Sequence, residues 1–166
     1  MRRLALFLLL AVALVASAAP SAAATGGWTW PVTGPIIRGF DPPDSPYGAG
    51  HRGIDIAVSA GTPIFAPAAG TVTFAGKVAG HLFLTVNHGG GVASTYSWLS
   101  ELRVKKGDAV AAGELIALTG WAHPGSLIPS LHFGVKLGAD YVDPLAYLAP
   151  ESVVGFIRLA PLGWVA

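Results

Sequence analysis

Glycine and proline divide the chain into short segments, and this spacing restricts the folds that it can form. The 166 residues include 22 glycines and 13 prolines. Between them lie short runs rich in valine, threonine and aromatic residues, which are typical of strands joined by tight turns. The pattern predicts a mostly β protein, with one compact antiparallel sheet folded or sandwiched on itself. The length fits a single domain with its own core.

The strand pattern is clearest in the second half of the chain. The turn 88–91 between two strand-like runs predicts a hairpin. In the run 131–137 the hydrophobic residues alternate, which places His132 on the face opposite to them. Asp143 followed by Pro144 predicts the start of a short C-terminal helix, with an N-cap and a proline in the first position. The expected strand regions are 36–40, 62–67, 70–76, 81–87, 92–99, 115–118 and 131–137.

The N-terminus has the layout of a secretory signal peptide. A basic start at residues 1–3 precedes the apolar run 4–15, and small residues then dominate through Ala24. Cleavage is expected near Ala18 or Ala24. The apolar run is shorter than the roughly 20 residues that span a bilayer, so no stable membrane span is expected after cleavage. The chain has no cysteine, which argues against a lipid anchor on the mature N-terminus.

The chain is expected to divide into four parts. In the lead-in segment, residues 25–35, Trp28 and Trp30 are expected to cap one end of the core, with stacking on sugar rings as the alternative. The C-terminal tail, residues 149–166, is apolar but short and interrupted by Arg158 and Pro161, so it is expected to pack on the domain or to be partly disordered. The parts are a signal peptide (1–24), a lead-in segment (25–35), a β domain (36–148) and an apolar C-terminal tail (149–166).

The charge balance excludes some partners. Loss of Arg2 and Arg3 with the signal peptide leaves 8 basic against 9 acidic residues, so the net charge moves from +1 to −1. Because no clustered basic face remains, no nucleic-acid partner is expected. Export without disulfides means that the core, and a metal if one binds, must supply the stability. A monomer is expected.

His51, Asp55 and His132 form a candidate metal site. On a straight strand, His51 and Asp55 would lie about 13 Å apart, too far for one metal. The segment must therefore bend, and Gly53 between them makes a bend plausible. His132 would add a third ligand. Three protein ligands leave one position for water, as in a hydrolytic zinc site.

The sequence resembles the lysostaphin/LytM-type zinc metallopeptidases over residues 34–148. The resemblance implies a secreted, cell-wall-associated protein that acts on the cross-bridges and stem peptides of bacterial peptidoglycan. It also implies that His51, Asp55 and His132 are the zinc ligands. The matching stretches are 51–57, 61–72, 86–91, 95–96, 104–110, 131–135 and 143–144.

Two positions depart from the family pattern. The family has one histidine at the end of a Tyr-x-His stretch and another at the start of a His-x-His pair, both beside the metal-bound water. Here these places hold Trp98 and Ser130. Trp98 can only donate a hydrogen bond, and Ser130 is a poor base. Ser130 shares face parity with His132 and is expected to line the cleft. A general acid–base group contributes about 10²- to 10⁴-fold in rate, so impaired catalysis is expected.

Three further histidines are possible substitutes for the missing pair. His88 lies in a turn typical of the family and is expected to be structural. His123 is expected to be an exposed loop residue, with a place in the cleft as the alternative. His81 begins a strand and carries no signal of a site.

Three functions follow from these residues. The favoured one is a zinc-holding but catalytically impaired member that binds cell-wall peptides or regulates a cell-wall hydrolase. The alternative is an active zinc endopeptidase with an altered catalytic set, so enzymatic activity stays an open question. A biotinyl- or lipoyl-like carrier is suggested by the stretch 104–110, but such carriers commonly place methionine beside the modified lysine. The only methionine here is Met1.

Overall fold

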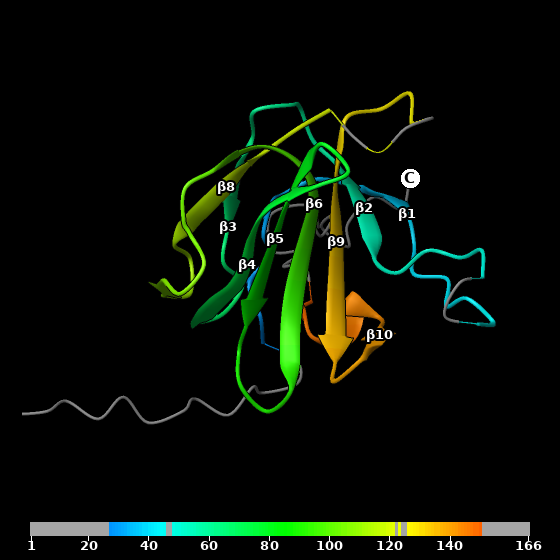
Figure 1. The fold of residues 1–166 in the computed structure, drawn as a ribbon. Helices are drawn as coiled ribbons and strands as arrows, with labels where there is room; N and C mark the ends of the chain where they lie inside the picture. Colours follow the sequence, from blue (N-terminus) through cyan, green and yellow to red (C-terminus); the bar gives the residue numbers. More distant parts are fainter. Residues whose placement is uncertain (1–26, 46–47, 122, 124–125, 151–166) are drawn as a thin grey trace, which may run out of the picture.

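A computed structural model describes residues 27–45, 48–121, 123 and 126–150. The expected signal peptide and residues 151–166 of the expected tail lie outside the described residues. The described chain forms a single antiparallel sheet, as expected, in the order β1-β2-β9-β6-β5-β4-β7, with β10 on β9 and β3 and β8 joined through β6 (Figure 1). The strands are β1 (Ile36–Arg38), β2 (Ile54–Ala57), β3 (Pro63–Phe65), β4 (Gly70–Val78), β5 (His81–Asn87), β6 (Val92–Leu102), β7 (Ala109–Val110), β8 (Leu115–Thr119), β9 (Ser130–Leu137) and β10 (Asp140–Val142).

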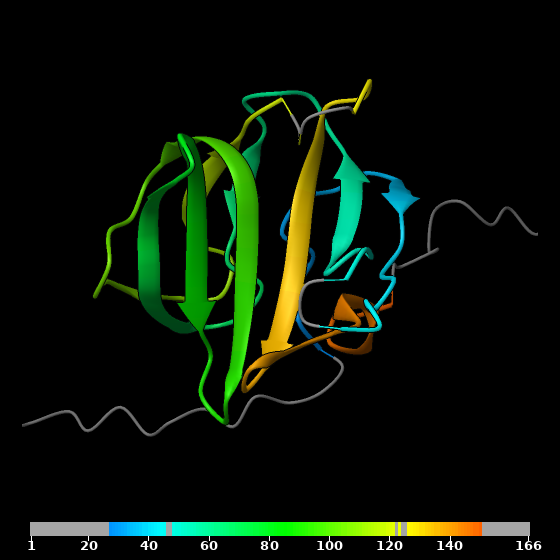
Figure 2. The ribbon, with the colours of Figure 1, turned by 45° about the vertical axis from the view of Figure 1, so that its right-hand side comes forward.

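The long strand β6 folds the sheet on itself by changing its partner. Residues 92–97 pair with β9, whereas Leu99 and the residues after it pair with β8. Strand β3 then pairs with β8. Figures 1 and 2 show the β3–β8 pair behind β4, β5 and β6. The hydrophobic faces of the two layers therefore enclose the core between them.

The alternation predicted for β9 is confirmed over most of the strand. Leu131, Phe133 and Val135 are fully buried, and His132 lies on the opposite face. Leu137 departs from the expected pattern, because it ends the strand and is 48% exposed. The core is continued by buried residues of β2, β5 and β6, among them Ile54, Leu84 and Tyr96.

The two ends of the domain are joined at the lead-in segment. Trp28 is 3% exposed, forms a parallel bridge with Leu148 and packs against the ring of Tyr147 at 5.2 Å. Trp30 donates its indole N–H to the carbonyl of Ala149 at 2.9 Å. The expectation that both tryptophans cap the core is confirmed, with Trp28 buried and Trp30 partly buried against it.

The expected C-terminal helix is a single 3-10 turn, η1 (Pro144–Ala146). Asp143 caps it by accepting a hydrogen bond from the Leu145 amide at 3.0 Å, and Pro144 takes the first position. The start signal was therefore read correctly, but the helix is shorter than expected. The chain closes on the lead-in segment at Leu148, so the turn has no room to lengthen.

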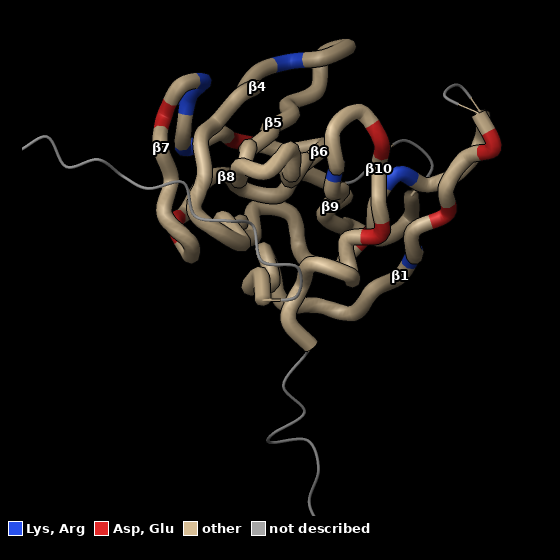
Figure 3. Tube along the Cα trace, turned by 90° about the horizontal axis from the view of Figure 1, so that it is seen from below, with Lys and Arg blue, Asp and Glu red and all other residues tan. Residues whose placement is uncertain are grey.

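Charged residues are few in the described chain and lie mainly near turns, with both signs interspersed (Figure 3). The absence of a basic face agrees with the charge balance of the sequence. Within the described ranges, no helix has the length and apolar character needed to cross a membrane.

Candidate metal centre

A bend before β2 brings His51 and Asp55 together. His51 lies outside the strand and is held by a bridge to Asp41, while Asp55 lies within β2 opposite His132 of β9. Gly53 passes so close to β9 that an added Cβ would lie 2.3 Å from the Phe133 carbonyl oxygen. Only glycine fits this approach. The backbone bends at residues 52–53, immediately before β2, so the expected bend is present.

Three donor atoms meet at the bend. The Nε2 atom of His51 lies 3.1 Å from Oδ1 of Asp55, and Nδ1 of His132 lies 2.8 Å from the same oxygen. The two ring nitrogens are 3.0 Å apart. His51 and Asp55 are buried, and His132 is partly exposed. The structure thus brings together the three residues that the sequence proposed as ligands.

The hydrogen bond on the far side of His51 fixes which nitrogen faces the cluster with a lone pair. Its Nδ1 atom lies 2.7 Å from the Gly39 carbonyl, which can only accept. Nδ1 therefore carries a proton, and in the neutral form of the ring the Nε2 atom points its lone pair at the cluster. In that form Nε2 and Asp55 Oδ1 are both acceptors. A proton or a metal cation at this point satisfies both.

Asp55 supplies the negative charge of the cluster. Burial acts to raise the pKa of its carboxyl group, but the hydrogen bond from His132, the positive charges that His132 and His51 carry when protonated, and the hydrogen bond from His123 together outweigh this effect. The net result is a lowered pKa, so the carboxylate is ionised at neutral pH.

The donor set fits zinc. Two imidazole nitrogens and one carboxylate oxygen are typical ligands of a catalytic zinc ion. Ligand atoms about 2.0–2.1 Å from a tetrahedral zinc lie about 3.3 Å from one another. The observed separations of 2.8–3.1 Å are close to this value. Only a small outward movement of the side chains would be needed to admit the ion.

A cavity of about 300 Å³ opens onto the cluster. Besides His51 and His132, its walls include two cations, Arg38 and Arg52, and the ring of Tyr141. The sequence reading did not find these three residues. Arg38 and Tyr141 come from the short strands β1 and β10, whose contribution depends on sheet pairing rather than on any local pattern.

Trp98 lies in the wall of this cavity, where the family pattern has a histidine. It marks the point where β6 leaves β9 for β8, and its φ of 63° is in the left-handed region. A residue at such an irregularity is turned away from the regular alternation of the strand. Its ring packs edge-on against His81, with centroids 4.4 Å apart. His81, which carried no sequence signal, therefore supports the cavity wall.

Ser130 does not line the cleft, contrary to the expectation from its parity with His132. It is 2% exposed and pairs with Ala57 at the start of β9. Its amide donates to the Trp121 carbonyl at 3.0 Å, so Trp121 lies beside the start of β9. Parity gave the correct face, but the side chain is buried there rather than open to the cleft.

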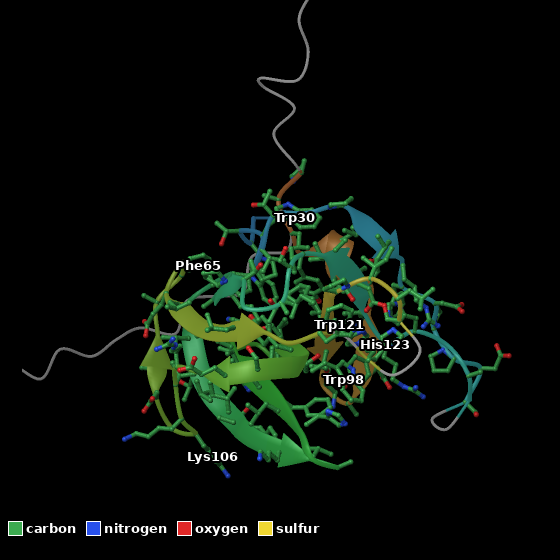
Figure 4. All side chains as sticks on the ribbon, turned by 90° about the horizontal axis from the view of Figure 1, so that it is seen from above. Trp30, Phe65, Trp98, Lys106, Trp121 and His123 are labelled. Atoms are coloured by element: carbon green, nitrogen blue, oxygen red, sulfur yellow. The ribbon has the colours of Figure 1, made fainter. Side chains whose placement is uncertain are left out.

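His123 occupies the cleft, so its interpretation as an exposed loop histidine was wrong. Its Nε2 atom lies 3.2 Å from Oδ2 of Asp55, and its ring lines the same cavity as Trp98. Figure 4 shows His123 and Trp98 on the same side of the domain, with Trp121 near them. The contact joins residues 68 positions apart, and a loop has no periodicity from which it could have been inferred.

His88, by contrast, is structural as expected. It is buried, with Nδ1 at 2.9 Å from the Ala69 carbonyl and Nε2 at 2.8 Å from the hydroxyl of Ser94. It lies outside the cluster of donor atoms found among the described residues.

Known proteins place this geometry in a family. The sequence pattern of Peptidase family M23 matches residues 49–144, more than half of the chain. An uncharacterized protein of Mycobacterium tuberculosis is 36% identical over 152 residues, which are 87% of this chain and 59% of the relative. The murein hydrolase activator NlpD of Salmonella typhimurium is 33% identical over 136 residues, 80% of this chain and 34% of the relative.

A solved structure gives the same result. A zinc containing peptidase from Vibrio cholerae superposes with a TM-score of 0.64 at 30% identity, over 76% of this chain and 41% of that one. The chain thus spans about three fifths or less of the relatives that it matches. The resemblance read from the sequence is confirmed, and the chain belongs to peptidase family M23, the lysostaphin/LytM-type metallopeptidases.

Proposed function

We propose that this domain holds one zinc ion through His51, Asp55 and His132 and binds peptidoglycan peptides with little or no cleavage. The observation that carries the proposal is the convergence of Nε2, Oδ1 and Nδ1 within 3.1 Å at the floor of an open cavity. Neither Trp98, in the cavity wall, nor the buried Ser130 replaces the family's histidines with a comparable base.

The expected impairment follows from what the remaining groups can do with a proton. Zinc in such a site supplies a Lewis acid and a coordination position for water or substrate. The indole of Trp98 can donate a hydrogen bond but cannot accept a proton from an attacking water. Ser130 is buried away from the cavity. The site can therefore still bind and orient a substrate, whereas its capacity for proton transfer is weakened.

The walls of the cavity suit a peptide that carries carboxylates. Arg38 and Arg52 bring positive charge beside the cluster, and guanidinium groups pair well with carboxylates. Tyr141 also borders two adjoining cavities, one beside Asp140 and one beside Phe83. A bound chain longer than the central cavity would therefore run past Tyr141 in either direction.

The proposed setting is the cell envelope. We propose that residues 1–24 are removed on export, that residues 36–148 form the working domain and that residues 149–166 follow it as an apolar tail. The name of the Salmonella relative describes a murein hydrolase activator. A cell-wall hydrolase is accordingly the proposed protein partner, in addition to peptidoglycan itself.

An active endopeptidase with an altered catalytic set is the second candidate. The position of His123 favours it, because this imidazole lines the cavity and contacts Asp55. If His123 can exchange protons with a water in the cavity, it would restore part of the missing acid–base chemistry.

Digestion of purified peptidoglycan, followed by muropeptide analysis, separates the two candidates. The mature, zinc-loaded protein is expected to release no new muropeptide fragments. It is also expected to remain bound to peptidoglycan when the peptidoglycan is sedimented. Cleavage that disappears in His51→Ala would overturn the impaired-enzyme proposal in favour of the second candidate.

A gain-of-function variant tests the reason for the impairment. Trp98→His, alone or together with Ser130→His, is expected to raise cleavage above that of the parent protein, because an imidazole returns to the cavity wall at position 98. Circular dichroism and zinc content must first match the parent, since Ser130 is buried. No gain in a folded, zinc-loaded variant would contradict the roles assigned to these positions.

A further inference from the structure

We propose that His123 is a positioning residue for the zinc site, which holds Asp55 through the carboxylate oxygen that faces away from the donor cluster. The inference rests on the proposed zinc binding and adds to it a function for the loop before β9. It assigns His123 neither as a ligand nor as a base.

The two oxygens of Asp55 have different partners. Oδ1 faces His51 and His132 at 3.1 and 2.8 Å. Oδ2 faces Nε2 of His123 at 3.2 Å. His123 does not belong to the set of ligand atoms that lie within 4.8 Å of one another. The carboxylate therefore stands between the cluster and His123, with one oxygen for each.

This arrangement restrains the carboxylate. The end group of an aspartate rotates over a broad range about its last bond unless both oxygens are engaged. A hydrogen bond to Oδ2 keeps Oδ1 aimed at the metal position and favours binding through one oxygen. Outer partners of this kind typically change metal affinity by about 10- to 100-fold.

Backbone hydrogen bonds lie on both sides of His123 in the sequence. The loop is tied to the start of β9 by the hydrogen bond from the Ser130 amide to the Trp121 carbonyl at 3.0 Å. On its other side, the Ser126 amide donates to the carbonyl of His123 at 3.2 Å. The backbone of His123 thus has one hydrogen bond of its own, and its side chain is only 28% exposed.

The test is the zinc affinity of the full chain after export processing, measured by competition with a chromogenic chelator. His123→Ala is expected to weaken binding by about 10- to 100-fold. His123→Gln, which keeps an N–H donor, is expected to recover part of that loss. His81→Ala is the matched control, because His81 contacts the ring of Trp98 outside the cavity lining and has no contact with Asp55 among the described interactions. Its affinity should stay close to wild type.

Cobalt substitution distinguishes a positioning residue from a fourth ligand. With Co²⁺ in place of zinc, added azide should shift the visible absorption band of both wild type and His123→Ala, because a coordination position is open in each. A shift seen only in His123→Ala would show that His123 itself fills that position and would overturn the inference.

The affinities also separate this inference from the proposed function. Wild type that binds no zinc would refute both. Wild type that binds zinc, with His123→Ala equally tight, would refute only the role of His123. Equal losses in His123→Ala and His123→Gln would mean that the N–H donor is not what matters, which also contradicts the inference.

Discussion

The domain contains two buried polar sites built around histidine, and they differ in how their protons are distributed. At His88 every donor meets an acceptor. Its Nδ1–H donates to the Ala69 carbonyl, its Nε2 accepts from Ser94, and the Ser94 oxygen accepts from the hydroxyl of Tyr96 at 2.9 Å. At His51 two acceptors face each other when the ring is neutral, because Nε2 then meets Oδ1 of Asp55 with its lone pair.

This difference separates a structural histidine from a candidate ligand. The His88 chain is complete without any added group, as buried polar groups in a stable core should be. The His51 cluster needs a shared proton or a metal cation, because a lone pair and an ionised oxygen repel each other. Burial is similar at the two sites, so the direction of the hydrogen bonds carries the distinction.

The largest predicted effect is the loss of metal binding at the His51 site. Asp55→Ala is expected to abolish zinc binding at micromolar metal, because it removes the anionic ligand and the oxygen shared by both histidines. Zinc content after gel filtration is the measurement. His88→Ala should keep its zinc, and equal zinc in Asp55→Ala and wild type would contradict the ligand assignment.

The next largest effect is a loss of stability at the His88 site. His88→Ala is expected to lower the free energy of unfolding by about 2–4 kcal/mol, because it leaves a cavity against Trp28 and unpaired polar groups at Ala69 and Ser94. Urea unfolding of the zinc-loaded proteins measures this difference. A change well below 1 kcal/mol would mean that the buried chain contributes little to stability.

Acid should weaken the fold through the same residue. Burial lowers the pKa of His88 below its usual 6.5, so the unfolded chain binds a proton that the folded domain does not. The free energy of unfolding should therefore fall as the pH drops below 6.5, and His88 should contribute no slope above that value. The difference between wild type and His88→Gln across this range isolates the contribution. Parallel pH profiles would contradict it.

A smaller effect is expected at Ser94, the next member of the hydrogen-bonded series that starts at His88. Ser94→Ala removes the hydroxyl between His88 and Tyr96 and should cost about 1–2 kcal/mol, with the zinc content unchanged. Thermal unfolding followed by circular dichroism would detect it. A loss larger than that of His88→Ala would show that Ser94, rather than the imidazole, is the centre of the buried chain.

The sequence predicted most of the sheet because its longer strands follow a simple alternation. The run around Leu131, Phe133 and Val135 reports a strand with one buried face, and its turns carry glycine. Strands β2, β7 and β10 were missed because they have only 4, 2 and 3 residues, too few to show a period. Strand β6 runs to Leu102, past the expected end at residue 99, because the irregularity at Trp98 interrupts the pattern within a continuing strand.

The candidate site was predicted unevenly for a similar reason. Local chemistry and a family resemblance identified His51, Asp55 and His132, and Gly53 indicated the bend between the first two. Ser130 and His123 were misplaced, because their positions depend on how the loop before β9 folds back over the sheet. Loop paths are set by tertiary contacts, and a single sequence contains little information about them.

The most direct measurement is the zinc content of the purified, export-processed protein, determined by mass spectrometry of the metal after dialysis and expressed per chain. The account predicts one zinc per chain in wild type, one in His88→Ala and none in His132→Ala. A wild type free of zinc, or a His132→Ala variant that retains a full equivalent, would contradict the claim that the cluster of His51, Asp55 and His132 is a metal centre.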